Sequence, residues 1–462
     1  MQDLTSGSVT RHLVKTASFM LVTMIFQTLY FLIDLYWVGR LGTDSVAAVG
    51  IAGNLTFIVL AATQMLGVGT TTLVSHAVGR RDHDGACMMF NQSQVLSVLI
   101  GFAFFAIAMA FRVSYSKSMS ADAQTAALAA EYLLWFIPAM GLQFALVAMG
   151  AALRGVGNFK PTMVVSTATV ILNMVLAPFL IFGWVTGHAF GVAGAAISSL
   201  IAIVIGVIWM ATYFLPRDSY LRFMVADWKP QLATWKRMIT IGLPSGFEFV
   251  LMAAYIAIVY TIAKPFGAAA QAGFGIGGRI VQAGFMPVVA LGFSVAPVAG
   301  QNFGARQRER VIDTFRHGAV MATAFMILFT IVCHIAPVAM VRVFSKDTAV
   351  IAVGEEYLRI ISLNYVASGI IFVNASMFQA MGNTIPSLIT SSVRIIVVAI
   401  PAIILSRMAG FDLTWVWWLS VASVFVQLGL SSLLLRREFA RRLAFPPPES
   451  ATVSIPAPAV TA

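Results

Sequence analysis

The first apolar stretch of the chain contains a single acidic residue, Asp34. Thr23, Gln27, Tyr30, Asp34 and Trp37 recur at steps of three and four residues, which places them on one face of a helix. A carboxylate at membrane depth costs about 2.5 to 3.5 kcal/mol on insertion scales, so it should face protein or a water-filled cavity. The polar stripe favours a cavity wall, where Asp34 can exchange a proton or a cation. The alternative is that Asp34 lies near the outer end of the span as a solvated interfacial acid.

A second polar face runs along a later apolar stretch, in which Thr162, Ser166, Thr169 and Asn173 recur at the same steps. Their hydroxyl and amide groups can donate and accept hydrogen bonds but carry no charge. We therefore expect this face to line a cavity as well.

The second half of the chain carries different charges. Glu248 shares a helix face with Met252 and Tyr255, and Arg394 lies inside another apolar stretch. An unpaired buried arginine is costly, so our hypothesis is that Arg394 and Glu248 neutralise each other, directly or through water. The alternative is that Arg394 reaches the membrane interface or backbone carbonyl groups.

No catalytic or metal-binding pattern is evident among the remaining reactive residues. His76, His188 and His334 are dispersed without ligand spacing, so we expect packing or interfacial roles. Cys87 and Cys333 are too few for a disulfide framework and also lack ligand spacing. An intramembrane enzyme would need paired acids or histidines on facing helices. We therefore expect neither an enzyme nor a bound metal or cofactor.

The composition identifies the elements that must position these residues. Hydrophobic residues make up 59% of the 462 positions and charged residues only 10%, which is too little charge for a water-soluble chain. The alternating ten-residue pattern of an outer-membrane barrel is missing. Instead, the chain contains apolar runs long enough to cross ~30 Å of hydrocarbon as helices. We predict an all-α integral membrane protein whose twelve transmembrane helices lie at 16–38, 46–74, 93–113, 127–152, 161–183, 190–215, 238–262, 274–300, 316–343, 355–380, 386–406 and 412–435.

The basic residues indicate how these helices are oriented. The first run follows a polar start with Arg11 and Lys15 and has no cleavage pattern, so we expect a permanent span. With both termini cytoplasmic, most of the 29 Lys and Arg residues lie in inside segments, as the positive-inside rule requires. The net charge of +11 thus reflects topology, and we expect no nucleic-acid partner. The segment 445–462 is rich in Pro and Ala and is predicted to be a disordered cytoplasmic tail.

The two halves of the chain match each other at one constant offset, which we call the repeat shift. The matched loop residues are Gly79 with Gly304, Arg81 with Arg306, Gly157 with Gly382, Asn158 with Asn383, and Pro161 with Pro386. Both units hold an even number of spans and enter from the same side, so a pseudo-two-fold axis along the membrane normal relates them. We predict two six-helix lobes, 1–215 and 238–444, joined by a cytoplasmic linker at 216–237. The charges are not repeated, since Asp34 maps onto Val259 and Glu248 onto Thr23.

From about residue 11 to 440 the chain resembles the MATE (multidrug and toxic-compound extrusion) transporters. The resemblance rests on the Asp34 span running into Gly39-Arg40-Leu41-Gly42, on the Gly79 half-motif and its repeat at Gly304, on Leu153-Arg154-Gly155-Val156-Gly157-Asn158 with Pro161, on Gln379-Ala380-Met381-Gly382-Asn383 with Pro386, and on Gly242-Leu243-Pro244 followed by Glu248. The last element is close to that of the DinF-like branch of the multidrug/oligosaccharide/polysaccharide flippase superfamily.

The resemblance implies twelve helices in two lobes, a central cavity, and export of amphipathic, often cationic compounds driven by a proton or sodium gradient. Asp34 matches the acid of the family's cation site in the first lobe. Asn173 matches the fifth-span Asn of that site, and Ser199 stands near its sixth-span hydroxyl. The three residues are therefore expected to couple ion movement to transport.

Two departures from the family pattern bear on the coupling ion. Where many relatives have an Asp four residues after that Asn, this chain has Ala177, and its tenth span offers only Asn364 and Asn374. A sodium ion requires several oxygen ligands, ideally charged, whereas a proton requires one carboxylate in a low-dielectric cavity. We therefore expect proton coupling rather than sodium coupling.

The expected function is antiport of small organic cations or amphipathic drugs by alternating access, in which proton and substrate compete for Asp34. The residues expected to line the substrate cavity are Gln27, Tyr30, Thr169, Glu248, Met252, Tyr255 and Arg394. We expect a monomeric, multi-pass protein of the inner or plasma membrane that contacts only its substrate and the lipid bilayer.

Two other transporter classes share parts of this pattern. A major-facilitator-type transporter also has parallel six-helix halves, but its loop after the second span usually carries an Asp-Arg pair, which the segment 75–81 lacks. A flippase of lipid-linked precursors would be expected to have more basic residues in its cavity and often extra spans. Export of a lipid-linked or other specific metabolite stays open as the alternative.

Overall fold

The computed structural model describes residues 3–184, 187–216 and 218–445. The first half forms α1 (Val9–Gly39), α2 (Thr43–Gly79), α3 (His83–Met119), α4 (Ala123–Gly155), α5 (Phe159–Phe182) and α6 (Gly191–Thr212). The second half follows the 3-10 helix η1 (Val225–Trp228) and forms α7 (Leu232–Ala263), η2 (Lys264–Phe266), α8 (Ala268–Gly304), α9 (Arg308–Ile335), α10 (Pro337–Arg342), α11 (Thr348–Ile361), η3 (Ser362–Asn364), α12 (Tyr365–Ala380), α13 (Ile385–Leu405) and α14 (Thr414–Arg442). The predicted disordered tail, apart from Phe445, lies outside the described residues.

Twelve helical segments in the described part are long and apolar enough to cross a membrane. They coincide with the twelve predicted spans, so the all-α membrane fold class is confirmed. The ninth span was predicted as one helix over 316–343 but is divided into α9 and α10. Pro337 begins α10 and has no backbone N–H to continue the α9 hydrogen-bond ladder, which explains the break.

The helix ends follow the same repeat shift as the sequence. The backbone after α2 turns at Arg81 with φ +58°, and the backbone after α8 turns at Arg306 with φ +57°. The same agreement holds after α4 and α12, where Gly157 and Gly382 have φ +77° and +73°. In the left-handed region a glycine carries no steric penalty, which accounts for its presence in both copies. The repeat is therefore present in the backbone as well as in the sequence.

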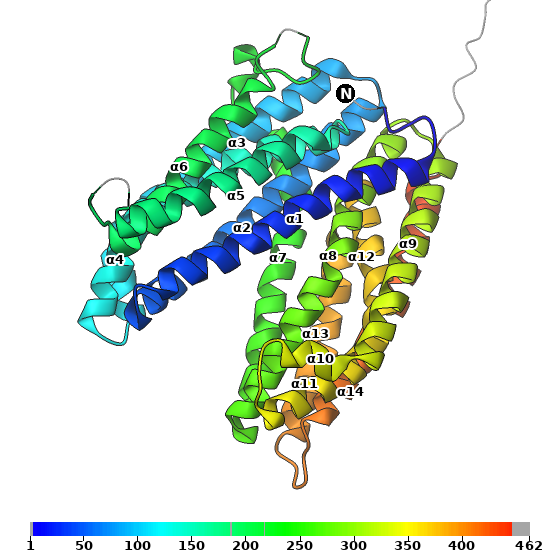
Figure 1. Ribbon diagram of the computed structural model, residues 1–462. Coiled ribbons are helices and arrows are strands. Elements are labelled where there is room, and N and C mark those ends of the chain that lie inside the picture. Colours follow the sequence, from blue (N-terminus) through cyan, green and yellow to red (C-terminus); the bar gives the residue numbers. More distant parts are fainter. Residues whose placement is uncertain (1–2, 185–186, 217, 446–462) are drawn as a thin grey trace, which may run out of the picture.

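The two sets of helices form two bundles, one of α1–α6 and one of α7–α14, which meet at one end and diverge toward the other (Figure 1). The first helix of each bundle packs on the second helix of the other, α1 on α8 and α7 on α2. Helices α2 and α8 also contact each other directly. Helices α1 and α7 begin, and helices α2 and α8 finish, on the same side of the molecule. We call this side the basic end, because five Lys and Arg side chains gather there around one cavity.

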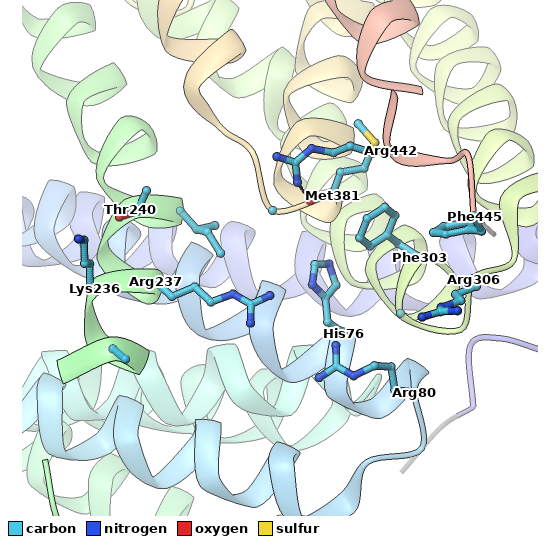
Figure 2. Close-up of a pocket in the computed structure, with 14 residues that line it drawn as sticks. His76, Arg80, Lys236, Arg237, Thr240, Phe303, Arg306, Met381, Arg442 and Phe445 are labelled. Atoms are coloured by element: carbon cyan, nitrogen blue, oxygen red, sulfur yellow. Dashed lines mark hydrogen bonds between the residues drawn. The ribbon is translucent and has the colours of Figure 1, made fainter. Parts of the chain in front are cut away.

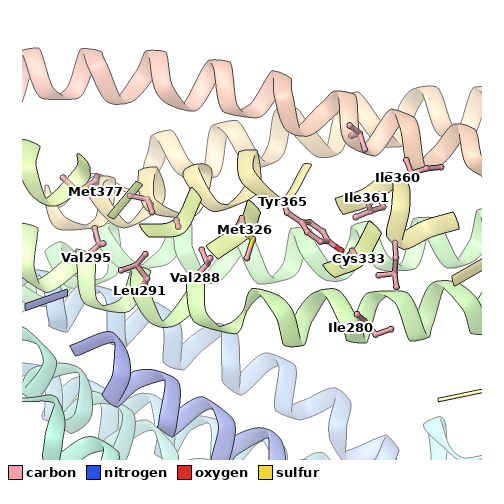
Figure 3. Packing of buried hydrophobic residues seen from close by; sticks show 14 of the residues in the cluster. Ile280, Val288, Leu291, Val295, Met326, Cys333, Ile360, Ile361, Tyr365 and Met377 are labelled. Atoms are coloured by element: carbon pink, nitrogen blue, oxygen red, sulfur yellow. The ribbon is translucent and has the colours of Figure 1, made fainter. Parts of the chain in front are cut away.

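Each bundle has its own apolar core. In the second bundle the core includes Val288, Leu291 and Val295 on α8, which pack toward Met326 of α9 and Met377 of α12 (Figure 3). Both cysteines are buried free thiols. Each core also takes in residues from the start of the other bundle, Leu4, Val9 and Leu13 in one case and Met238 and Ile241 in the other, so apolar contacts join the two bundles.

Candidate functional site

A hydrogen-bonded polar cluster joins α1, α5 and α6 in the first bundle. The Asn173 side-chain amide donates to the hydroxyls of Ser198 (3.2 Å) and Ser199 (3.0 Å), and each serine in turn donates to the carbonyl oxygen of Ala195. The Tyr30 hydroxyl lies 3.0 Å from Ser199 Oγ, and because the Ser199 proton goes to Ala195, Tyr30 is the donor. This places three predicted residues in one network.

Asp34 stands beside this network without joining it. Its Oδ1 atom is buried and accepts no hydrogen bond from any described residue. The carboxylate interacts electrostatically with Tyr30 on its own helix and with Tyr132 on α4. A buried carboxylate oxygen without a donor is costly unless it binds a proton or a cation. A proton or a cation bound at this oxygen would remove the cost, and the position of Asp34 on a cavity wall stays a prediction.

The other donors of the cluster are already used within the protein. Ser199 donates to Ala195 and accepts from both Asn173 and Tyr30, so its proton and both lone pairs are engaged. Ala177, which stands where many relatives have an Asp, is buried in the apolar core. Asp34 is the one carboxylate among these residues, and Ser199 holds Asn173 and Tyr30 in place.

The second bundle holds a different cluster between α7 and α13. Ser387 Oγ donates to Glu248 Oε1 at 2.6 Å. Two turns further along both helices, the Arg394 guanidinium lies 5.6 Å from the centroid of the Tyr255 ring. The same sequence separation relates both pairs, so α7 and α13 run side by side in one register. The Tyr255 hydroxyl continues the cluster to Ser420 on α14 at 3.0 Å.

The direct form of the Glu248–Arg394 hypothesis is wrong for this conformation. No ion pair joins them within the described part of the chain. Ser387, the partner of Glu248, precedes Arg394 by seven residues, which corresponds to about 10 Å along a helix. Arg394 instead lies over Tyr255, and its Nε atom is buried without an acceptor among the described residues. A link through water stays a prediction.

The two acids lie at different depths. Under the repeat shift Glu248 corresponds to Thr23, which precedes Asp34 by eleven residues. This separation is about 16 Å along a helix axis, with Glu248 nearer the basic end. Gln27 and Met252 are exposed and lie outside both hydrogen-bonded clusters, so their predicted place in the substrate cavity stays a prediction. The acid of the first lobe and the acid of the second lobe therefore lie at different distances from the basic end.

Several site residues were missed by the sequence analysis. Tyr132 and Ser198 complete the surroundings of Asp34 and Asn173 but stand on helices without a polar stripe. The repeat shift maps Tyr255 onto Tyr30. Both tyrosines bind a serine on the last helix of their bundle, Ser420 and Ser199. The repeat shift relates the two tyrosines but not the two serines, since it carries Ser199 onto Val424.

The basic end is held closed by a symmetric pair of hydrogen bonds, which the sequence analysis also missed. His76 of α2 donates through Nε2 to the carbonyl oxygen of Ala380 in the other bundle at 2.6 Å. Gln301 of α8 donates through Nε2 to the carbonyl oxygen of Gly155 at 2.8 Å. The repeat shift carries His76 onto Gln301 and Gly155 onto Ala380. The pseudo-two-fold axis therefore relates the two hydrogen bonds. In each of them a side chain of one bundle donates to a backbone carbonyl oxygen of the other bundle.

Two glycines allow α2 and α8 to approach closely at this point, which we call the α2–α8 seam. A Cβ atom added to Gly79 would overlap the carbonyl oxygen of Gln301, and one added to Gly304 would overlap the carbonyl oxygen of His76. Both were predicted as structural loop residues. The structure gives their role, which is to let the two helix ends touch through backbone atoms.

The N-terminal segment packs into the same end. Leu4 is fully buried, its N–H donates to Gln301 Oε1, and its carbonyl oxygen accepts from Asn302. Arg310 donates to the carbonyl oxygen of Gly7. The Thr5 hydroxyl donates to Asp3, and this hydrogen bond is the main reason that the pKa of the Asp3 carboxyl lies below its ordinary value. The segment therefore adds to the contacts that close the basic end.

Comparison with known proteins gives consistent results over both bundles. The family model described as MatE matches residues 20–179 and 244–405. Among curated relatives, the probable multidrug resistance protein NorM of Thermotoga maritima is 22% identical over 90% of each chain. The multidrug export protein MepA of Staphylococcus haemolyticus is 26% identical over 79% of each chain. The FAD transporter of Shewanella oneidensis is 22% identical over 80% of this chain and 82% of its own.

Solved structures share the arrangement of the helices. An outward-facing multidrug resistance MATE transporter of the MOP superfamily superposes with a TM-score of 0.88 at 25% identity, covering 96% of this chain and 98% of that chain. A MOP superfamily transporter from Pyrococcus furiosus, described as having a binding pocket of reverse polarity, superposes with a TM-score of 0.87 at 25% identity, covering 95% and 98%. With the family model matching well over half of its length, the chain belongs to the MATE family of membrane transporters.

Proposed function

We propose that this chain exports amphipathic organic cations by proton-coupled antiport, with Asp34 as the shared binding group for proton and substrate. The observation that carries the proposal is the buried, unpartnered Oδ1 of Asp34 beside the Tyr30–Ser199–Asn173 network. Relatives named multidrug export or multidrug resistance proteins support the substrate class. The gathering of Lys and Arg at the basic end supports a cytoplasmic orientation of that end and of both termini.

Proton coupling is supported by the composition of the site. Asp34 is the one carboxylate of the cluster, and the Ser199 hydroxyl has no lone pair left for a cation. Sodium would need several further oxygen ligands in place of these internal hydrogen bonds. A proton needs only the Asp34 carboxylate, and its binding removes the charge that holds a cationic substrate.

The proposed cycle follows from this competition. With the basic end closed, Asp34 receives a proton from the outer side and the bound cation leaves, because its counter-charge has gone. With the basic end open, Asp34 or Glu248 gives its proton to the cytoplasm and a new cation binds. The change between the states is a change in the angle of the two lobes, 1–215 and 238–444, around the linker 216–237. We further propose that the protein acts as a monomer in the inner or plasma membrane.

Separate ion gradients test the proposal directly. We expect a proton gradient imposed on proteoliposomes to drive export of a cationic dye, and a sodium gradient to drive none when a proton ionophore is present. The measurement is dye fluorescence against time, with protein-free liposomes as the control. Transport driven by sodium alone would contradict proton coupling while leaving the export function intact.

A second candidate, export of an anionic metabolite, is favoured by one specific observation. Arg394 carries a positive charge inside the second bundle, and no residue in the described part of the chain accepts a hydrogen bond from its buried Nε atom. A relative named FAD transporter and a structural neighbour described as having a pocket of reverse polarity are consistent with an anionic substrate. In that case Arg394 would bind the substrate directly during export.

Substitution of Arg394 separates the two candidates. Because a cationic substrate gains nothing from Arg394, we expect Arg394→Gln to keep dye export within about twofold of the wild-type rate. Arg394→Lys, which keeps the charge but loses the planar guanidinium, is the matched control. If flavin nucleotides are exported and Arg394→Gln slows their export by about tenfold or more, the second candidate replaces the first.

A further inference from the structure

A cavity of about 680 Å³ opens at the basic end beside the α2–α8 seam (Figure 2). Its volume falls within the range of about 300 to 1,000 Å³ typical of small-molecule sites. Its described lining includes no Asp or Glu and comes from both bundles, with His76 and Arg80 from the first and Lys236, Arg237, Arg306 and Arg442 from the second. The proposed export cycle assigns no role to this cavity.

The positive charge of the cavity is largely unbalanced. Lys236, Arg237 and Arg306 form no ion pair within the part of the chain that the structure describes. Of the two other cations, Arg80 has a carboxylate oxygen 3.7 Å away and Arg442 has one 2.7 Å away. The positive-inside rule requires basic residues on the cytoplasmic side of the membrane but does not require their side chains to surround one cavity. Membrane orientation alone therefore does not explain this cluster of cations.

Arginines from the two bundles converge on His76. Arg80 of α2, Arg237 of α7 and Arg442 of α14 all interact electrostatically with the His76 ring. Figure 2 shows these three side chains around the ring, with Arg237 and Arg80 approaching it from α7 and α2. Like charges repel more strongly as they approach, so this arrangement opposes closure of the α2–α8 seam. An anion placed between the arginines would convert the repulsion into attraction across the two bundles.

We propose that this cavity binds a phosphate-bearing anion, which bridges the two bundles and stabilises the closed seam. Guanidinium groups bind phosphate oxygens through pairs of parallel hydrogen bonds, and several such groups can surround one polyanion. Apart from Thr240 and His76, the rest of the described wall is apolar, with Phe303, Met381 and Phe445 beside the arginines. This combination suits an amphipathic phosphate, supplied either by the head group of an anionic phospholipid or by a soluble polyphosphate.

The test measures seam closure with the full chain in nanodiscs. Ser75 lies fully buried in the seam, so a Ser75→Cys probe in a background with Cys87→Ala and Cys333→Ala reports opening by its reaction rate with a maleimide. One arm adds inorganic triphosphate to phosphatidylcholine nanodiscs, and the other replaces part of the phosphatidylcholine with phosphatidylglycerol. We expect at least one arm to slow the reaction by about tenfold. Slowing by triphosphate identifies a soluble ligand, and slowing by phosphatidylglycerol alone identifies a lipid.

Paired substitutions show whether the effect belongs to the cavity. Arg237→Gln with Arg306→Gln removes two unpaired cavity charges and is expected to abolish the slowing. The matched control is Arg308→Gln with Arg437→Gln, which removes two exposed arginines outside the cavity and should retain it. The proposal is overturned if neither arm slows the wild-type reaction, or if the control pair loses the effect as fully as the cavity pair. Because the readout is not transport, either result leaves the proposed export function to be judged separately.

Discussion

Asp34→Asn is expected to abolish proton-driven export of a cationic dye. The substitution keeps the size of the side chain but removes its charge and its ability to exchange a proton. A charge-assisted hydrogen bond is worth about 1.5 to 3 kcal/mol, so loss of the carboxylate should weaken binding of the cation by about ten- to a hundredfold. The measurements are dye efflux from proteoliposomes under a proton gradient and dye affinity at several pH values. In the wild type affinity should fall with rising proton concentration, and in Asp34→Asn it should not change with pH.

Glu131→Gln is the matched control for this prediction. Glu131 is an exposed acid of the same bundle, next in sequence to Tyr132, and its loss should leave both readouts within about twofold of wild type. A thermal unfolding measurement on each purified variant separates a folding defect from a coupling defect. Full gradient-driven efflux by Asp34→Asn would show that another group carries the proton.

The sequence predicted the helices well because hydrophobic length is a local property. A run of about 20 apolar residues must be helical in lipid, whatever it packs against. The interruptions were harder to predict, since an apolar run continues through Pro337 although the helix ends at Ile335. The repeat was visible because Arg81 and Arg306, like Gly157 and Gly382, keep both residue type and backbone conformation in the two halves.

The candidate site was predicted only in part, because contacts between helices depend on their rotation and depth. The stripe on α1 placed Tyr30 and Asp34 on one face, and Asn173 with Ser199 was expected from the family resemblance. That Tyr30 reaches Ser199 requires the positions of α1 and α6, which no stripe encodes. The direct pairing of Glu248 with Arg394 failed for the same reason. Charge balance indicated that Arg394 should have an acidic partner. The register of α7 and α13 instead places Ser387 beside Glu248.

The seam shows a second limit of sequence reasoning. His76 was expected to be a packing or interfacial residue, and Gln301 was not singled out. The repeat shift relates these two donors, and it also relates their acceptors, Ala380 and Gly155. The shared contact is recognised only when both hydrogen bonds are known. Hydrogen bonds to backbone carbonyls leave no trace in the identity of the acceptor residue. The symmetry therefore identifies this contact as a property of the pair of lobes rather than of either lobe alone.

The second prediction with a large effect concerns this contact. Gly79→Ala is expected to hold the basic end open, because the new Cβ would overlap the carbonyl oxygen of Gln301 and the two backbones would have to separate. Overpacking of this kind costs about 1 to 3 kcal/mol, which shifts the balance between closed and open seam by about five- to a hundredfold. Gly304→Ala should act in the same way through His76, and the double substitution should have the larger effect.

The maleimide reaction of a Ser75→Cys probe measures the opening, and dye efflux measures its consequence. We expect the probe to react faster by the same factor, and export to fall because the outward-facing state is rarely reached. Gly429→Ala is the matched control, since a Cβ there meets no atom within 4 Å and alanine is the better helix former. If Gly79→Ala left both the probe reaction and export at the level of Gly429→Ala, backbone contact at the seam would not be what closes the basic end. A faster probe reaction with undiminished export would instead separate closure of this seam from the transport cycle, and the mechanism would need another barrier on the cytoplasmic side.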